Sequence, residues 1–445
     1  MSSLSRRTVL QTLGGAGLTA AAGAATSGLV LSRGVTAQAA KSLDPVFTFV
    51  SLPDFMNGDV ADLQVLPTWD GGANSVNQSW EGAMERALLA VADVQPDAVF
   101  LAGDMVEGRW NVDTENRQLF GPVNQGIDPE SIAMCKSAIT SAGGVYYSYH
   151  ADLFASHDLP LYPAVGDHEI LDDRPGPLND RWNPSGVTLG QPDNRYYLVD
   201  HAKSVWADHF TRPGGVPRFT RRPVGTAAEF SAYSVSFADA LTLITVDTFM
   251  RTAHGVRLGV FDAQLRWLQR EIRRAKRRGH VVVVQGHIPV MHPTRWWASG
   301  RLRVPEGRQS VFYQVLRREG VDVYLCGEVH DSTVIQHGRR APVQISHGCI
   351  FEYGFSYLVG RLYPDRRLVL DLYEIPLVGA SLERELWCTQ GGKSQRTFLE
   401  YGAPAHRGRL VQQDREVLRR TAKLGRYDRN DDPYDLRHHS QTQPI

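Results

Sequence analysis

Short runs of apolar residues alternate along the chain with segments of helical periodicity. The runs are rich in β-branched residues and are bounded by glycine, proline or polar residues, a pattern typical of strands that are buried on both faces. They predict strands at residues 46–50, 98–101, 161–165, 241–246, 281–284 and 321–325.

Helical periodicity is clearest after Asp262, which we expect to be the N-cap, and it ends at Gly279. Between them, apolar residues recur at steps of three and four: Leu265, Leu268, Ile272 and Ala275. Residues 80–94 and 309–318 show the same spacing. Strands separated by helices predict an α/β fold with a central sheet.

Two regions lack this regularity. Residues 171–222 are rich in Pro, Gly, Asp and Arg, and we expect a lid or substrate-side insertion there. The mature domain is therefore expected at 41–385, interrupted by that insertion. Residues 386–445 are expected to form a polar C-terminal extension, with a short helix near 410–424 and a disordered tail in which His438 and His439 have no metal-binding role.

The first 40 residues have the order of an export signal. Arg6 and Arg7 form a twin-arginine pair, a weakly apolar stretch follows to about Leu31, and Ala37 and Ala39 make a small-residue cleavage site. We expect residues 1–40 to be read by the twin-arginine export machinery, and the mature protein to be periplasmic or extracellular. No later run approaches the roughly 20 apolar residues that a membrane span requires.

The charge of the chain is balanced, with 48 basic and 48 acidic residues among 445. No net field therefore recruits nucleic acid or an anionic membrane. The basic segment 270–278 lies at the end of a predicted helix, where the helix dipole favours cations, and we interpret it as a solvated face in preference to a nucleic-acid patch.

The four cysteines are far apart in the sequence: Cys135, Cys326, Cys349 and Cys388. Their spacing excludes a zinc finger or a thioredoxin-like redox pair. Cys326 ends a predicted strand, and we expect it to be a small buried residue and not a ligand.

Four of the predicted strands end in the same way, with a glycine followed by Asp, His or Glu. Ligands of open α/β sheets bind at the carboxyl ends of the strands, so these side chains are expected to converge in space. Glycine lets the backbone turn sharply and approach an ion closely. The four segments are GDMVE at 103–107, GDHE at 166–169, GHIP at 286–289 and GEVH at 327–330.

In this order and at these strand ends, the segments resemble the calcineurin-like metallophosphoesterases, which include the purple acid phosphatases. The family's blocks are D-x-H, G-D-x-x-[DE], G-N-H-[DE], G-H-x-P and G-H-x-H, and the helix DAQLRWLQREI before GHIP is also similar. The resemblance covers about residues 44–375. It implies a four-layer α/β/β/α sandwich and two divalent metal ions, roughly 3.5–4 Å apart, bridged by an aspartate and a hydroxide nucleophile.

The resemblance also implies a role for each matching residue. Asp104 is similar to the carboxylate that bridges the two ions. One ion would be held by Asp167, His287 and Glu328, and the other by Asp54 and His330. His168 occupies the position that stabilises the phosphoryl oxygen or protonates the leaving group, with Glu169 as an orienting partner.

The first block departs from the family, because FVSLPDFMNGD contains no D-x-H. If Ser51 aligns with the family's serine, Leu52 replaces the aspartate and Asp54 the histidine. If one residue is inserted, Asp54 is the aspartate, and Asn57 or Asp59 could supply the missing ligand. Both alignments retain Asp54 as a ligand.

Two further departures add negative charge. Asp167 replaces an asparagine, and Glu328 replaces a histidine. A site rich in carboxylates favours oxygen-seeking ions such as manganese, magnesium, calcium or ferrous iron. A site rich in imidazole would instead favour zinc.

The predicted function is an exported, metal-dependent phosphoesterase that hydrolyses a phosphomonoester or phosphodiester. The alternative is a catalytically degenerate metal-binding or structural protein on the same fold, which the missing D-x-H favours. His168 argues for the enzyme, because a structural metal site needs no histidine beside its ligands. The substrate is expected to be a small phosphate ester, and arginines of the insertion could bind its phosphate.

Overall fold

The structure is a computed structural model that describes residues 44–52, 54, 78–106, 108–112, 118, 120–172, 182–291, 302–329, 332–346, 354–381 and 398–421. The chain divides into two compact units, Met1–Ser42 and Leu43–Ile445. The first unit, with the predicted signal peptide, lies outside the described residues. Among the helices that are described, none has the length and apolar character needed to cross a membrane.

The helices of the second unit are α1 (Gln78–Ala92), α2 (Pro129–Ser156), α3 (Arg195–Phe210), α4 (Asp262–Arg277) and α5 (Val311–Glu319), with 3-10 turns η2 (His168–Ile170), η4 (Pro213–Gly215) and η5 (Gly307–Gln309). Its strands are β1 (Phe47–Leu52), β2 (Ala98–Leu101), β3 (Leu161–Pro163), β4 (Val187–Thr188), β5 (Gln191–Pro192), β6 (Tyr233–Phe237), β7 (Leu241–Thr245), β8 (Phe249–Thr252), β9 (Gly255–Leu258), β10 (Val281–Gln285), β11 (Val323–Cys326), β12 (Thr333–Ile335), β13 (Val343–Ser346), β14 (Gly354–Leu362), β15 (Leu368–Ser381), β16 (Phe398–Tyr401), β17 (Ala405–Gln413) and β18 (Glu416–Arg420).

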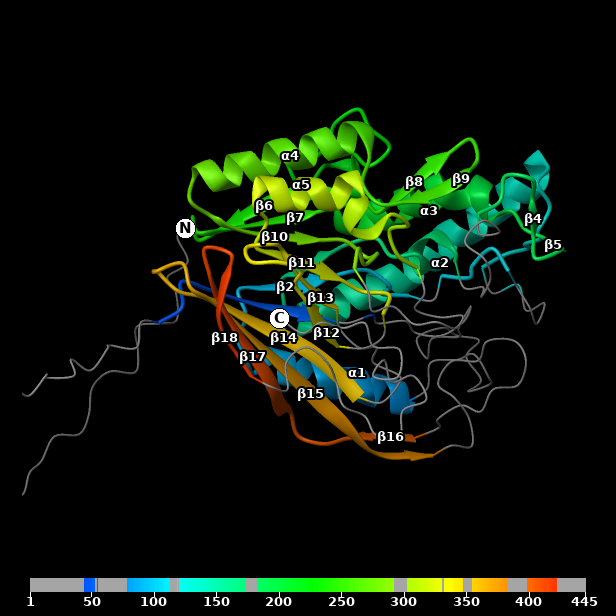
Figure 1. The fold of residues 1–445 in the computed structure, drawn as a ribbon. Coiled ribbons are helices and arrows are strands. Elements are labelled where there is room, and N and C mark those ends of the chain that lie inside the picture. The colour runs from blue at the N-terminus through cyan, green and yellow to red at the C-terminus, as the bar shows by residue number, and fades with distance from the viewer. Residues whose placement is uncertain are drawn as a thin grey trace, which may run out of the picture. The chain divides into compact units, whose positions relative to one another are not determined.

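These strands form two mixed sheets (Figure 1). The first sheet has the order β18-β17-β15-β14-β1-β2-β3, with β16 paired to β15, and its strands β1, β2 and β3 are parallel. The second sheet has the order β12-β13-β11-β10-β7-β6, in which β13, β11, β10 and β7 are parallel. The predicted α/β class is confirmed.

The strands are apolar on both faces, which explains why their sequences are continuous hydrophobic runs. In β10, Val281 and Val283 belong to the cluster that joins the two sheets, whereas Val282 and Val284 belong to the cluster on the helix side. Side chains of a strand alternate between faces, so each strand contributes to both cores. In β1, Phe49 lies in the cluster between the sheets and stacks on Phe100 of β2.

Helices cover the outer faces of the sheets. Helices α4 and α5 pack against each other, and α4 contacts β7 and β10 (Figure 1). On the first sheet, Leu88 and Val91 of α1 share a cluster with Val50 and Leu52 of β1. This packing leaves the carboxyl ends of the parallel strands as the edge at which loops can meet.

The helix predicted near residues 410–424 is wrong, because the described part of this segment forms β17 and β18. These strands extend the first sheet by pairing with β15 and with each other. Leu410 and Gln412 are buried while Arg409 is exposed, a period of two that belongs to a strand. The predicted domain boundary at 385/386 therefore falls between β15 and β16, which pair with each other.

The segment 171–222 contains a regular element that its composition did not predict. Helix α3 packs against α2 and η2. Its buried face includes the charged side chains of Arg195 and Lys203 as well as apolar residues, so no purely apolar stripe was visible in the sequence. Helix α4 begins as predicted, except that its N-cap is Phe261 and not Asp262.

Candidate metal centre

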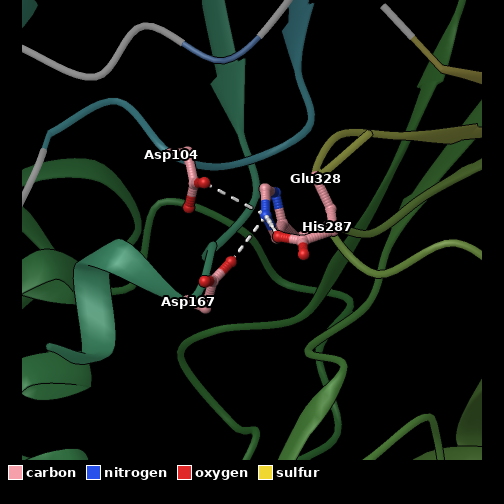
Figure 2. Close-up of side chains that lie close together, drawn as sticks. All are labelled: Asp104, Asp167, His287 and Glu328. Atoms are coloured by element: carbon pink, nitrogen blue, oxygen red, sulfur yellow. Dashed lines mark ion pairs between the residues drawn. The ribbon is translucent and has the colours of Figure 1, made fainter. Parts of the chain in front are cut away.

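Four acidic or histidine side chains from four strand ends meet at one place. Asp104 follows β2 and Asp167 follows β3 of the first sheet, whereas His287 follows β10 and Glu328 follows β11 of the second. One potential ligand atom from each residue lies within 4.8 Å of those of the other three, and all four residues are buried. Figure 2 shows the three carboxylates arranged around the imidazole.

The imidazole of His287 is oriented by its second nitrogen. Its Nδ1–H donates a hydrogen bond to the carbonyl oxygen of Ala102 at 2.9 Å, which leaves Nε2 directed at the carboxylates. Nε2 lies 2.7 Å from Asp167 Oδ1, 3.2 Å from Asp104 Oδ2 and 3.6 Å from Glu328 Oε2. A backbone acceptor that fixes the tautomer is the usual arrangement behind a metal-binding histidine.

The donor set fits a cation. Three buried carboxylates and a lone pair on Nε2 of a neutral imidazole would repel one another in a site of low polarity. Asp104 Oδ2 and His287 Nε2 are both buried and form ion pairs within this cluster, 3.2 Å between the two atoms and 2.7 Å from Nε2 to Asp167 Oδ1. A positive ion placed between these groups would remove the repulsion.

Asp54 lies directly beside this cluster and supports Glu328. It is buried, and its Oδ2 accepts a hydrogen bond from the backbone N–H of Glu328 at 2.9 Å. A Cβ added at Gly327 would lie 2.3 Å from Asp54 Oδ1 and 2.7 Å from His287 Nδ1. The predicted ligand is therefore at the edge of the site, although it is not one of the four residues whose ligand atoms converge.

Two of the converging carboxylates sit on left-handed backbone. Asp104 has a φ of 55° and Glu328 has a φ of 66°. Non-glycine residues adopt this conformation rarely, and when they do so it is often at functional sites. The turn before Asp167 also needs glycine, because a Cβ at Gly166 would lie 2.0 Å from Asp104 Oδ1.

Glu169 joins two of the ligand-bearing turns. Its Oε2 accepts hydrogen bonds from the backbone N–H groups of Asp104 at 2.9 Å and Gly166 at 2.6 Å, and its Oε1 accepts one from Met105 at 2.7 Å. We expected Glu169 to orient His168. These bonds instead give it a positioning role for the two turns, which residue type and spacing alone did not indicate.

His168 lies at the rim of the cluster. Its backbone N–H donates to Asp104 Oδ1 at 3.2 Å, and its ring Nε2 is 3.9 Å from Asp104 Oδ2. Its side chain is 13% exposed, compared with 0–5% for the four converging side chains. The ring can therefore contact a group that enters from solvent while it remains next to Asp104.

Burial and mutual repulsion shift the acids toward their protonated forms. Burial, followed by the charge of Asp167, raises the pKa of Glu328 to about 8. Burial and the charge of Asp104 raise the pKa of Glu169 to about 7, and burial raises the pKa of Asp54 well above its usual value. Burial alone would lower the pKa of His287, but Asp104 and the other carboxylates raise it well above 6.5. Without a metal, the cluster therefore holds protons that a bound cation would displace.

One aromatic side chain contacts His287 from outside the cluster. The ring of Phe249 is stacked on the imidazole, with centroids 6.3 Å apart. Asp247 follows β7 and is therefore another acid after a strand, like Asp104 and Asp167. Its carboxylate instead accepts hydrogen bonds from Lys203 at 2.7 Å and Ser231 at 2.5 Å. It is therefore held outside the cluster. The sequence signal, Asp247 directly after a strand, was present but was not recognised.

Several predicted residues lie outside the described part of the chain. They are the metal ligand His330 and the alternative ligands Asn57 and Asp59. Cys326 is fully buried with a free thiol, as predicted.

Comparison with known proteins identifies one family. Residues 60–332 match the calcineurin-like phosphoesterases. No curated protein matches the sequence. Solved structures, among them the following three, are also similar at low identity. A dimetal phosphatase from Danio rerio has 15% identity and a TM-score of 0.41, with 74% of this chain and 96% of that chain covered.

The other two structures are GAP50, described as the anchor in the inner membrane complex of Plasmodium, and a putative 5'-nucleotidase from Staphylococcus aureus. GAP50 has 12% identity and a TM-score of 0.38, with 74% of this chain and 84% of that chain covered. The nucleotidase has 10% identity and a TM-score of 0.37, with 80% and 53% covered.

Proposed function

The chain belongs to the calcineurin-like phosphoesterases, which makes it a hydrolase of phosphoric esters, and we propose that Asp104, Asp167, His287 and Glu328 form the core of its metal centre. The observation that carries this proposal is the orientation of His287. Its Nδ1–H is fixed by Ala102, so Nε2 faces three buried carboxylates across 2.7–3.6 Å.

We assign the ligands to two divalent ions. Asp104 would lie between them, Asp167, His287 and Glu328 would hold one, and Asp54 with His330 would hold the other. When bound, such a pair of ions polarises phosphoryl oxygens and lowers the pKa of water. The oxygen-rich donor set supports manganese, iron, magnesium or calcium over zinc.

His168 is proposed as the residue that contacts the substrate. Its ring is at the rim of the cluster, partly exposed and 3.9 Å from Asp104. From this position, it would donate a proton or a hydrogen bond to an oxygen of the phosphate ester. Glu169 would act at a distance from the substrate by holding the turns of Asp104 and Gly166 together.

We further propose that the protein is exported by the twin-arginine machinery and acts outside the cytoplasm, as the order of residues 1–40 supports. The proposed arrangement of the domain is a four-layer α/β/β/α sandwich. It is supported by the cluster of apolar side chains shared by the two sheets and by the helices packed on their outer faces.

The test combines metal analysis with activity. Metal content would be measured on the protein without its signal after manganese loading, and hydrolysis of p-nitrophenyl phosphate and bis-p-nitrophenyl phosphate would be assayed on the same sample. We expect two ions per chain and hydrolysis of one or both esters. His168→Ala should abolish hydrolysis while both ions stay bound.

The exposed His254 of the β8–β9 turn provides a matched control, and His254→Ala should change neither quantity. Two bound ions without hydrolysis of either ester would contradict the enzymatic proposal and favour the degenerate metal-binding protein. No metal bound by the folded parent protein would contradict both.

A further inference from the structure

A buried aspartate on the first sheet is surrounded by cationic side chains. Asp371 of β15 is fully buried and accepts hydrogen bonds from Arg409 at 2.6 and 2.9 Å, from Arg361 at 3.1 Å and from His406 at 2.9 Å. One carboxylate cannot neutralise both arginines. Its bidentate contact instead fixes the plane of the Arg409 guanidinium, which is 45% exposed.

These residues line a cavity of about 510 Å³ on the same sheet. Four arginines surround it, against the single acid Asp371: Arg361, Arg367, Arg409 and Arg419. The remaining lining includes Tyr363 and Tyr373. The cavity therefore carries a strong positive charge, in a protein whose net charge is zero.

Two of the arginines have no close carboxylate partner among the described residues. Arg419 forms no ion pair with any residue that the structure describes. Arg367 lies over the ring of Tyr363, 4.8 Å from its centroid, and its closest carboxylate is that of Asp365 at 3.7 Å. Both guanidinium groups are thus available to an anion. Those of Arg361 and Arg409 are held in place by hydrogen bonds to the buried carboxylate of Asp371.

The cavity is separate from the metal centre. Arg361 is paired with Thr48, near the start of β1, whereas Asp54 follows the end of the same strand. At about 3.3 Å per residue, the four residues from Thr48 to the end of β1 at Leu52 already span roughly 13 Å, and Asp54 lies beyond that end. A ligand in this cavity would therefore not contact the metal ligands.

The side chains also restrict the kind of anion. Tyr373 is stacked between Tyr357 at 5.4 Å and the edge of His406 at 5.3 Å, and Arg367 covers one face of Tyr363. These aromatic faces are already occupied, so they do not favour a nucleobase. Several guanidinium groups around one space suit an anion with several phosphate oxygens and more than one negative charge.

We propose that this cavity, the arginine cavity, is a binding site for multivalent phosphate, such as a short phosphate chain or clustered phosphate head groups. The site does not rest on the metal centre or on the proposed catalysis. Its affinity should fall as the ionic strength rises, because its arginines are partly exposed.

The test titrates inorganic tripolyphosphate into the full chain at low salt, in buffer freed of metals by a chelating resin. The double variant Arg367→Gln with Arg419→Gln should bind about tenfold more weakly, because it removes two charged hydrogen-bond donors. Among the described residues, neither arginine forms a hydrogen bond or ion pair with Asp371, so we expect the fold to survive, and thermal melting would verify this.

A matched double variant, Arg366→Gln with Arg420→Gln, removes the same charge from neighbouring positions. Arg420 pairs with Leu410, whose side chain belongs to the core between the sheets, so it lies on the opposite face of β18 from Arg419. The affinity of this control double variant for tripolyphosphate should stay within about twofold of the parent.

A second arm of the experiment would measure sedimentation of the parent and both double variants with phosphatidylcholine vesicles that contain phosphatidic acid.

The outcomes separate the sources of phosphate. A selective loss of tripolyphosphate binding in the first double variant supports a site for a free phosphate chain. A selective loss of vesicle binding alone supports the same site acting on head groups at a membrane surface. Equal losses in the two double variants, or no binding by the parent in either arm, would overturn the proposal.

Discussion

The backbone N–H of Glu328 donates a hydrogen bond to Oδ2 of Asp54 at 2.9 Å, although the two residues are 274 positions apart in the chain. This bond joins the end of β1 in the first sheet to the end of β11 in the second. It also stabilises the left-handed conformation of Glu328, whose φ is 66°. Asp54 therefore supports the candidate metal centre whether or not it contacts an ion itself.

We expect the substitution Asp54→Ala to destabilise the metal-free protein by about 1–3 kcal/mol, because it leaves the buried N–H of Glu328 without its acceptor. Asp54→Asn retains a side-chain oxygen and should cost less. Urea unfolding in a metal-free buffer would measure both. Equal stability of the alanine variant and the parent would show that the bond contributes nothing to the turn.

Gly166→Ala should disrupt the metal centre, because the added Cβ would lie 2.0 Å from Asp104 Oδ1 and 2.4 Å from its backbone nitrogen. Metal content and hydrolysis should both be lost. Gly144→Ala is the control, since its Cβ meets nothing within 4 Å inside α2 and should stabilise the protein by about 0.5–1 kcal/mol. Unchanged metal binding by the Gly166 variant would contradict the described turn.

The stability of the metal-free protein should fall as the pH rises from about 4.5 to about 8. Glu169 and Glu328 have folded-state pKa values of about 7 and about 8, above the usual 4.5, so the unfolded chain loses these protons first. The raised pKa of His287 acts in the same direction. Thermal melting across this range would measure the effect.

Metal binding should have the opposite dependence on pH, because a cation must displace the same protons. Affinity for manganese is therefore expected to increase as the pH rises over this interval. A melting temperature of the metal-free protein that rises with pH would be evidence against protonated acids in the cluster.

Glu328→His and Asp167→Asn should each shift metal preference toward zinc. The first introduces an imidazole ligand and both remove a negative charge from the cluster, which weakens the preference for oxygen-seeking ions. Competition between zinc and manganese, followed by elemental analysis, would measure the shift. An unaltered ratio in both variants would mean that these two side chains do not decide which ion is bound.

Arg195→Met should destabilise the protein by about 3–5 kcal/mol. Arg195 is buried, donates hydrogen bonds to Asp172 and Asp193, and ties α3 to the loop that follows His168. Its removal leaves two buried carboxylates without their cation. Arg212→Met is the control, because its ion pair with the half-exposed Asp208 should contribute less than about 1 kcal/mol. Similar losses in the two variants would contradict this assignment.

The sequence determined the class of the fold and most of the candidate ligands, because both depend on local patterns. Apolar runs with glycine and an acid or histidine at their ends predicted the strands that carry Asp104, Asp167, His287 and Glu328. Their convergence followed from the general rule that parallel strands end at one edge. The helix predicted near 410–424 was wrong because β17 and β18 are defined by pairing with β15, a contact between distant parts of the chain.

Tertiary structure alone decided how each side chain is used. The three hydrogen bonds of Glu169 and the bond between Asp54 and Glu328 go to backbone groups, whose positions depend on how the loops meet and not on residue type. Asp247 also follows a strand, yet Lys203 of α3 keeps it outside the cluster. The arginine cavity likewise exists only because strands distant in sequence place their charges on one face of a sheet.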